Sequence, residues 1–392
     1  MFTSARTVTA AAGLTLICVA MLPGGAAAQT GSAARTSSVP QQMPSDAATD
    51  VFAPALSYSG RYIAHIAIRR DVTNPRQQVR RTDLSTGGSE LLNVALNGGV
   101  APGNYSRPPV ISGDGSRIAF TTNGAQLVAG DNNGRYDAFV RDASTNTTLL
   151  TSRAYNGGVS NADSGMTSLS KNGRYAVFTS SGTDLVPGST TTNSDVYRRD
   201  LNSNTTVQVT VRPNGTPSIG PGSTSVDVSA DGHLVAFNSY NTDLAPTDGA
   251  DQEADLFIRN LTTKQTVWLS SGLPVGANPS GVVISPNGQW VSSRWDGDGS
   301  LHLTKVDTRV TSTVASEGYA LTGAFSTDLG RFVFISGGKP YVRNLSTGVN
   351  TAIPVPSGGF ATDATISGNG QFVAYDWFPD DGSASRIFRV QL

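Results

Sequence analysis

The chain has 392 residues, of which 28 are basic and 29 acidic, so its formal net charge is −1. With 38% hydrophobic residues it can bury a substantial core, which excludes a disordered chain. Nucleic acids and anionic membrane surfaces are bound by clustered excess Lys and Arg, which a near-neutral chain does not provide overall. We therefore expect no nucleic-acid partner.

The first 28 residues have the pattern of a secretory signal peptide. Arg6 supplies a positive charge, a mostly apolar run extends from Val8 to Leu22, and three small residues ending at Ala28 precede the expected cleavage site. The run is too short to span a bilayer comfortably, and no later stretch approaches the roughly 20 apolar residues of a membrane-spanning helix. We predict that residues 29–392 are exported, to the periplasm or the cell exterior, without a membrane span.

A short motif that recurs seven times indicates a repeat architecture. Each copy has an apolar residue, a serine, a turn with Asp or Asn and Gly in most copies, and an apolar strand, as in ISGDGSRIAF from Ile111. Successive motif serines are 55, 58, 59, 56, 41 and 41 residues apart and are Ser57, Ser112, Ser170, Ser229, Ser285, Ser326 and Ser367. Self-similarity at such a period is typical of solenoids and propellers.

Each unit carries two further strand signals. A third apolar run is seen in DAFVRDAS from Asp137 and DLFIRNLT from Asp255, and a Thr-rich fourth run follows, as in TTVQVT from Thr205. Thr, Val and aromatic residues between turn residues favour strands, and no window has a convincing helical period. The sequence therefore predicts an all-β, seven-bladed β-propeller of four-stranded antiparallel blades, forming one domain over residues 29–392.

The last unit lacks a fourth strand, because the chain ends with its third, Arg386 to Leu392. Near the N-terminus, Ala34 to Val39 resembles a fourth strand, and Val39 precedes the first motif serine by a distance similar to that in other units. We predict that residues 34–39 complete the last blade, which removes an unpaired sheet edge. The alternative is that this Ser- and Ala-rich segment is a linker.

The repeat, with its Ser-x-Asp/Asn-Gly turn, resembles the WD-like repeat of the TolB-like propellers. The resemblance extends from about Thr36 to Leu392 and implies the propeller fold, but it is hardly specific for an activity. TolB itself has an α/β domain ahead of its propeller, and propeller-bearing prolyl oligopeptidases add a hydrolase domain with a nucleophile elbow. We expect neither addition here, and hence a propeller alone.

Strand parity predicts which face of the ring binds. The connections after strands two and four of an antiparallel blade open on one face, and the tight turns after strand one open on the other. The long connections of blades two to four all fall in the first set, at 123–136, 153–165, 181–194, 211–224 and 240–254. We call this side the ridge face and expect binding there, because loops on a rigid scaffold often carry function.

Charged residues are unevenly spread along the ridge face. Complementary charge steers the encounter of binding partners, so we predict a rim that is basic in blade one and acidic in blades two to four. Its candidate ligand-binding residues are Arg69, Arg70, Arg76, Asp184 and Asp243. The alternative is that these are ordinary solvated charges, which are the default on any soluble protein.

One loop is a candidate structural calcium site. In GDNNGRYD from Gly130, the residues Asp131, Asn133 and Asp137 offer hard oxygen ligands on a short turn. The spacing does not match the twelve-residue calcium loop, and Asp and Asn are also common turn formers. We expect no other cofactor.

Catalytic signals are weak. The three histidines, His65, His233 and His302, fall in different units, so nothing indicates a metal site or a Ser-His-Asp triad. We predict a monomeric, noncatalytic binding scaffold whose partner is an envelope or extracellular protein. One alternative is a hydrolase or lyase at the channel mouth, which needs converging acids. Another is glycan binding on exposed aromatic residues, with candidates Tyr105, Tyr155, Tyr240 and Trp377, although core packing is the favoured role of Trp377.

Overall fold

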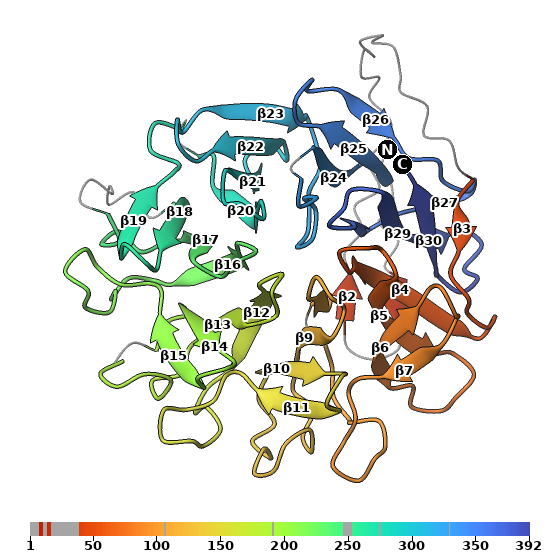
Figure 1. Ribbon diagram of the computed structural model, residues 1–392, viewed down its shortest axis with the longest axis horizontal. Coiled ribbons are helices and arrows are strands. Elements are labelled where there is room, and N and C mark those ends of the chain that lie inside the picture. The colour runs from red at the N-terminus through yellow and green to blue at the C-terminus, as the bar shows by residue number, and fades with distance from the viewer. Residues whose placement is uncertain are drawn as a thin grey trace, which may run out of the picture.

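The computed structural model describes residues 39–105, 107–189, 192–245, 253–273, 276–328 and 330–392, and an isolated pair of strands, β1 (Val8–Ala10) and β2 (Leu14–Leu16). Over residues 39–392, seven antiparallel sheets stand around a central axis (Figure 1). This confirms the predicted seven-bladed β-propeller. No helix within the described ranges is long and apolar enough to cross a membrane. Apart from β1 and β2, the expected signal peptide lies outside the described residues.

Blades one to four follow the predicted order, with the first strand innermost. Blade one contains β4 (Thr49–Leu56), β5 (Tyr62–Arg69), β6 (Gln77–Asp83) and β7 (Ser89–Leu91). Blade two contains β8 (Val110–Ile111), β9 (Arg117–Thr122), β10 (Asp137–Asp142) and β11 (Thr147–Leu150). Blade three contains β12 (Ser164–Leu169), β13 (Tyr175–Ser180), β14 (Asp195–Asp200) and β15 (Thr205–Gln208). Blade four contains β16 (Ser223–Val228), β17 (Leu234–Ser239), β18 (Asp255–Asn260) and β19 (Gln265–Trp268).

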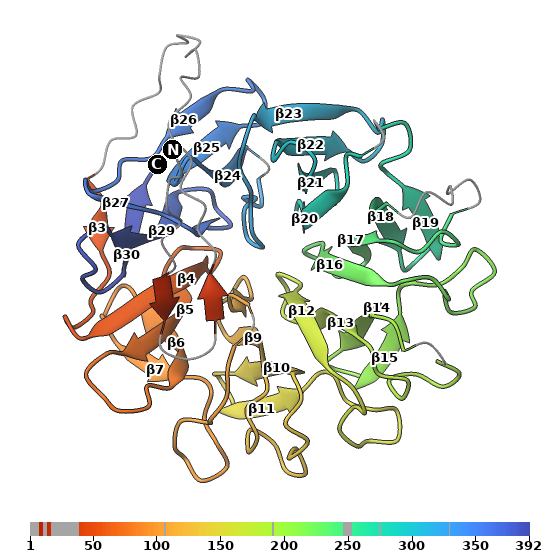
Figure 2. The same ribbon diagram turned by 180° about the vertical axis from the view of Figure 1, so that it is seen from behind.

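The last three blades are less regular. Blade five contains β20 (Pro279–Ile284), β21 (Trp290–Trp295), β22 (Leu301–Lys305) and β23 (Thr311–Ala315). Blade six contains β24 (Arg331–Ser336), β25 (Lys339–Asn344) and β26 (Asn350–Ala352), and isolated bridges take the place of its innermost strand. Blade seven contains β27 (Gly359–Phe360), β28 (Ala364–Ile366), β29 (Phe372–Pro379), β30 (Arg386–Gln391) and the N-terminal β3 (Gln41–Gln42). Figure 2 shows the inner strands, β12, β16 and β20 among them, around the central axis.

An N-terminal strand closes the last blade, as predicted. Gln41 and Gln42 of β3 pair with β30, and the Met43 amide donates to the Ile387 carbonyl at 2.8 Å. The closing strand lies just after the predicted segment, of which Ala34 to Ser38 fall outside the described residues. Met43 is buried against blades one and seven, so closure adds apolar burial as well as backbone hydrogen bonds.

We expect removal of this strand to destabilise the ring. A chain beginning at residue 44 loses the Met43 side chain and the β3 ladder, at a cost of about 2–4 kcal/mol, and thermal denaturation should show a lower Tm than for a chain beginning at residue 29. In the control, Gln41→Ala with Gln42→Ala keeps the backbone pairing and should leave the Tm nearly unchanged. An equal Tm for the two chain lengths would contradict a closing role for β3.

The motif serines act as local hydrogen-bond hubs. Ser112 Oγ donates to Asp114 at 2.6 Å and accepts from the Arg117 amide at 3.0 Å, which fixes the turn after strand one. Backbone hydrogen bonds then join these turns from blade to blade, for example from Tyr58 N to Gly113 O at 2.7 Å and from Gly113 N to Lys171 O at 2.8 Å. These hydrogen bonds thus link the turns of neighbouring blades on one face of the ring.

Arginines fasten most blades to the next. In five of the seven seams, a guanidinium donates to the carbonyl of the turn glycine in the following blade, at distances of 2.5 to 3.2 Å; the acceptors are Gly60, Gly115, Gly173, Gly232 and Gly370. Apolar side chains fill the space between neighbouring sheets, as where Leu256 and Ile258 of blade four meet Val282 and Val291 of blade five. The core is therefore a series of inter-blade layers.

Candidate functional site

Three equivalent hairpins follow strand four of blades one to three. Each is closed by one isolated bridge, and they are Val94–Val100, Arg153–Val159 and Val211–Pro217, here called ridge hairpins one to three. At each tip an Asn side chain accepts from the amide two residues on, at 2.9 to 3.0 Å. This repeat was not predicted from the sequence. Its signal was the Asn-Gly pair that favours tight hairpins, recurring at Asn97, Asn156 and Asn214.

The ridge hairpins are braced by the next blade. The Leu96 amide donates to the Gln126 carbonyl at 2.8 Å, and the Tyr155 amide donates to the Asp184 carbonyl at 2.8 Å. In hairpin three, Arg212 Nε donates to Asp243 at 2.7 Å. These contacts join connections after strand four to connections after strand two, which places both sets on one face as strand parity predicted. The loops after β7, β11 and β15 extend outward beyond the sheets (Figure 1).

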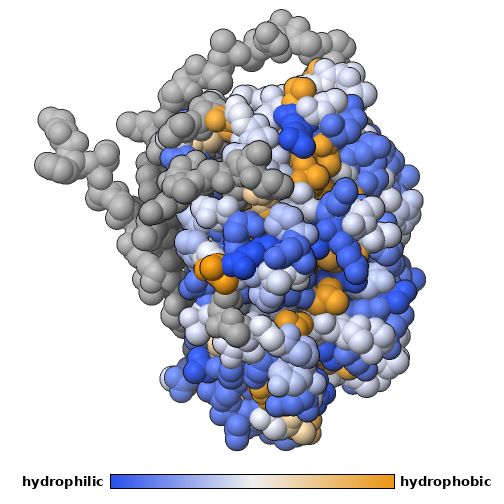
Figure 3. All heavy atoms as spheres, turned by 90° about the vertical axis from the view of Figure 1, so that its left-hand side faces the viewer, coloured by the Kyte–Doolittle hydropathy of each residue, from blue (hydrophilic) through white to orange (hydrophobic). Residues whose placement is uncertain are grey.

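Exposed apolar side chains accompany these hairpins. Leu96 is 66% exposed, Tyr155 is 63% exposed, and Ile219, just beyond hairpin three, is 66% exposed. The Ile219 amide donates to Asp243, so its backbone is also held. By contrast, the edge of the ring in Figure 3 is mainly hydrophilic, with separate hydrophobic spots. The ridge face therefore presents apolar groups on loops that are already ordered.

All five predicted rim charges make hydrogen bonds within the protein, and that of Arg76 is to the Val100 carbonyl. Arg69 pairs with Asp71 at 2.5 Å, and Arg70 donates to the Gly382 carbonyl at 2.9 Å. Asp184 accepts from the Asn161 amide, and Asp243 accepts from Arg212 and the Ile219 amide. Arg76 alone of the three arginines has no carboxylate within ion-pair distance among the described ranges. The five residues stand in three blades, and their binding role stays a prediction.

In the candidate calcium loop, Asp137 has a structural role that other blades repeat. The buried Asp137 accepts from Ser152 Oγ at 2.6 Å, as Asp195 does from Thr210 and Asp255 from Ser270. Burial, with the charge of Asp131 nearby, raises the pKa of Asp137 to about 7. The Asn133 amide nitrogen also faces it, at 3.4 Å.

No group of three or more His, Cys, Asp or Glu that could hold a metal occurs in the described part of the chain. Asp131 and Asp137 nevertheless lie near each other, with Asn133 beside them. Calcium binding by Asp131, Asn133 and Asp137 therefore stays a prediction.

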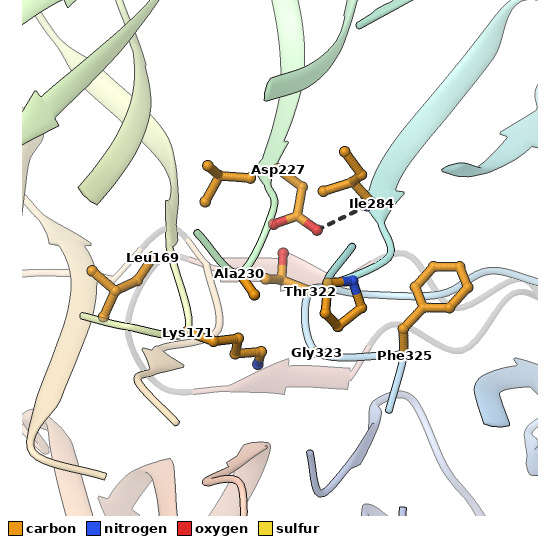
Figure 4. Close-up of a pocket in the computed structure, with 10 residues that line it drawn as sticks. Leu169, Lys171, Asp227, Ala230, Ile284, Thr322, Gly323 and Phe325 are labelled. Atoms are coloured by element: carbon orange, nitrogen blue, oxygen red, sulfur yellow. Dashed lines mark hydrogen bonds between the residues drawn. The ribbon is translucent and has the colours of Figure 1, made fainter. Parts of the chain in front are cut away.

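The inner strands of the ring carry a buried carboxyl group, Asp227, beside a lysine, Lys171. Asp227 accepts from Ser168 Oγ at 2.5 Å and from the Ile284 amide at 3.0 Å, and burial raises its pKa to about 6. Figure 4 shows Lys171 and Thr322 near the same small cavity. Burial lowers the pKa of Lys171. The cavity holds about 20 Å³, which is room for about one water molecule and not for a substrate.

A pair of buried carboxyl groups lies at the seam between blades seven and one. Asp376 accepts from the amides of Thr362 and Asp363, both at 2.8 Å, and from the Ala53 amide at 3.3 Å. Burial raises the pKa of Asp376 to about 6, and burial with the neighbouring charge raises that of Asp363 well above its usual range. Asp376 thus holds the seam through its backbone contacts, and Asp363 is buried beside it.

Neither His65 nor His302 is arranged for nucleophilic catalysis. His65 is buried, which lowers its pKa to about 4, and its Nδ1 has no hydrogen-bond partner among the described residues. His302 stacks on Trp295 and meets Ser300 Oγ at 2.6 Å, and that hydroxyl also bonds Asp298. The serine therefore lies between acid and imidazole, whereas a catalytic triad needs the imidazole in the middle.

Most of the candidate glycan-binding aromatic residues are not exposed. Tyr105 is only 3% exposed and packs into a hydrophobic cluster, so the expectation that it is exposed is wrong. Trp377 is 4% exposed and packs into the core, the role that the sequence favoured for it. Tyr240 is half-buried, and only Tyr155 of the four is well exposed.

Comparisons with known proteins find likeness at the level of structure. Neither a scan against protein-family models nor a search of curated proteins finds a match. An oligogalacturonate lyase from Vibrio parahaemolyticus matches with a TM-score of 0.59 and 12% identity, over 89% of this chain and 92% of that one. The common feature is the propeller.

TolB proteins are also among the matched structures. TolB from Acinetobacter baumannii is 22% identical with a TM-score of 0.42, over 67% of this chain, and the match spans about half of that protein, 53%. A putative TolB from Agrobacterium tumefaciens is 16% identical with a TM-score of 0.46, over 78% of this chain and 91% of that one. Of the three matches, that with the TM-score of 0.59 supports the fold, and at 12% identity it does not establish an activity.

Proposed function

We propose that this chain is a noncatalytic binding module that holds a protein partner against its ridge face. The observation that carries the proposal is the row of braced ridge hairpins with exposed Leu96, Tyr155 and Ile219. Ordered loops lose little conformational entropy on binding, so the apolar area they bury contributes more fully to affinity. Aromatic side chains such as Tyr155 are also enriched at the cores of protein interfaces.

We expect the partner in the same cellular compartment as the exported chain. The N-terminal pattern of Arg6, an apolar run and small residues at Ala28 supports export, so we propose an envelope or extracellular protein as the partner. A saccharide-acting enzyme is the competing function, because an oligogalacturonate lyase is among the matched propellers. Incubation of the chain with oligogalacturonate, followed by analysis for shortened products, tests that alternative directly.

The ridge-face proposal is tested by capture with a matched control. Residues 29–392 are immobilised, and envelope and culture extracts are passed over them with calcium or with chelator. We expect one protein to be retained by the wild type and reduced at least about tenfold by the triple variant Leu96→Ser, Tyr155→Ser, Ile219→Ser. If the wild type retains the protein with calcium but not with chelator, the contact depends on calcium.

The control variant is Val310→Ser. Val310 is 63% exposed, like Tyr155, but lies in the turn between β22 and β23, which strand parity places on the opposite face. Retention of the same protein by this variant is expected. Equal retention by the triple variant, or equal loss in the control, would contradict binding through the ridge hairpins.

A further inference from the structure

A polar groove of about 430 Å³ opens between blades one and two on the ridge face. Its lining comes from residues 74–76 after β5 with Gln77 at the start of β6, residues 102–104 ahead of β8, and residues 123 and 125 after β9. This volume lies within the usual range for ligand sites in proteins.

The wall of the groove is a tight contact between two glycines. A Cβ on Gly103 would lie 2.4 Å from the Gly124 Cα, and a Cβ on Gly124 would lie 2.0 Å from the Pro102 carbonyl oxygen. The Asn104 amide donates to Asn123 Oδ1 at 2.8 Å across the same contact. Because no side chain fits between these loops, the wall is set before any ligand arrives.

Gln77 offers a fixed donor in the groove. It is only 4% exposed, and its Oε1 accepts from the Tyr105 amide at 2.9 Å. A backbone N–H can only donate, so this bond identifies the oxygen and leaves Nε2 as the other atom. No described protein group accepts from that Nε2.

Arg76 supplies the charge. One Nη donates to the Val100 carbonyl at 2.9 Å, which ties the guanidinium to ridge hairpin one. No carboxylate of the described residues lies within ion-pair distance of it, and the described lining of the groove contains no acidic residue. An anion is therefore the complementary ligand, and guanidinium groups bind carboxylates through paired N–H donors.

The rest of the lining favours a peptide. Side-chain amides, at Asn74, Asn104 and Asn123, can bond with both N–H and C=O groups of an extended backbone. Pro75, Pro102 and Ala125 add apolar contact, and no aromatic ring is present among the described lining residues for a sugar to stack on.

We propose that this groove binds an acidic, extended segment of the protein partner, with an Asp or Glu carboxylate seated on Arg76 and Gln77 Nε2. The inference rests on the proposed function, because it takes the partner to be a protein. Since Val100 belongs to ridge hairpin one, a single partner can occupy the groove and contact Leu96 together.

The test uses residues 29–392 and fluorescein-labelled nonapeptide libraries with blocked termini, read by fluorescence anisotropy. One library has Glu fixed at the centre and Ala, Gly, Ser or Leu elsewhere, and its counterpart has Gln at the centre. We expect the Glu library to bind at least about tenfold more tightly, since a charge-assisted hydrogen bond is worth roughly that factor or more. Equal binding or no binding of the two libraries would overturn the proposal.

Two variants locate the site. Gln77→Glu keeps an oxygen for the Tyr105 amide but replaces the free donor with a negative charge, and Arg76→Gln removes the cation; each should weaken binding of the Glu library at least about tenfold. Asn161→Asp, on the ridge face but at blade three, is the control and should bind as the wild type does. Tight binding of trigalacturonate in place of the Glu library would instead assign the groove to an acidic saccharide.

The two proposals fail separately. If the hairpin variant loses its captured protein but the Glu library does not bind, the groove assignment is wrong and the ridge-face function stands. If the Glu library binds through Arg76 while the hairpin variant captures normally, the groove stands and the hairpins are not the contact surface.

Discussion

Replacing Gly232 with alanine is expected to lower the free energy of unfolding by about 3 kcal/mol or more. Gly232 has a φ of +80°, and a Cβ there would lie 2.0 Å from Cδ2 of Tyr175 in the preceding blade. Tyr175 is buried, and the guanidinium carbons of Arg174 and Arg198 lie over its ring at 4.9 and 4.4 Å. The ring therefore cannot move aside without opening the seam between blades three and four.

Urea unfolding of the wild type and of two glycine variants measures this effect. Gly157→Ala is the matched control, because Gly157 has a φ of +89° but a Cβ there would have no neighbouring atom within 4 Å among the described residues. It carries the backbone cost alone, about 1 kcal/mol. Similar losses in both variants would show that the seam is not tightly packed at Gly232.

Stability should fall as the pH rises from 5 to 8, by about 3 kcal/mol or more in total. Burial raises the pKa of Asp137 to about 7, that of Asp227 and Asp376 to about 6, and that of Asp363 well above its usual range. In the unfolded chain these carboxyl groups lose their protons near pH 4. The folded state thus holds more protons in this window, and their stabilising effect is lost as the pH passes the folded-state values.

Two histidines of the described chain act in the opposite direction, because burial lowers the pKa of His302 as well as that of His65. Burial lowers the pKa of His65 to about 4, whereas in the unfolded chain a histidine binds a proton below about pH 6.5. The unfolded state therefore holds more protons at this site, and stability is lost as the pH falls below about 6.5. Salt-bridged carboxyls such as Asp200, whose pKa Arg174 holds down to about 2, titrate below the window. The four carboxyl groups outnumber the two histidines, so the net slope is a fall with rising pH.

Chemical denaturation at pH 5, 6.5 and 8, at constant ionic strength, checks the sign. Asp137→Asn and Asp227→Asn should each flatten the pH dependence, because an amide does not titrate. Asp71→Asn, at an exposed site paired with Arg69, should leave the slope as it is. Stability that rises steadily from pH 5 to pH 8 would contradict the raised pKa values of the buried carboxyl groups.

Much of the propeller could be predicted from the residues alone. The motif serines recur because each one ties its own turn, from Ser112 to Asp114 and Arg117, and contacts between residues two to five apart are visible in a linear pattern. Strand alternation and parity likewise follow from local chemistry, so the number of blades and the face that carries the long loops were predictable. The last blade's need for an N-terminal strand followed from counting strands.

The contacts of the candidate site join residues that are far apart in the sequence, so no local sequence pattern could predict them. Asp184 and Asp243 resembled free rim charges in the sequence, but folding places the preceding inter-blade loops against them, 23 to 31 residues away. The Ala53 amide meets Asp376 across 323 residues because the ring closes there, and burial at that seam then sets the carboxyl pKa. The groove at Arg76 exists only where two glycines, Gly103 and Gly124, bring separate loops into contact. Local bonding is visible in the repeat, whereas burial and free hydrogen-bonding capacity arise only when the blades meet.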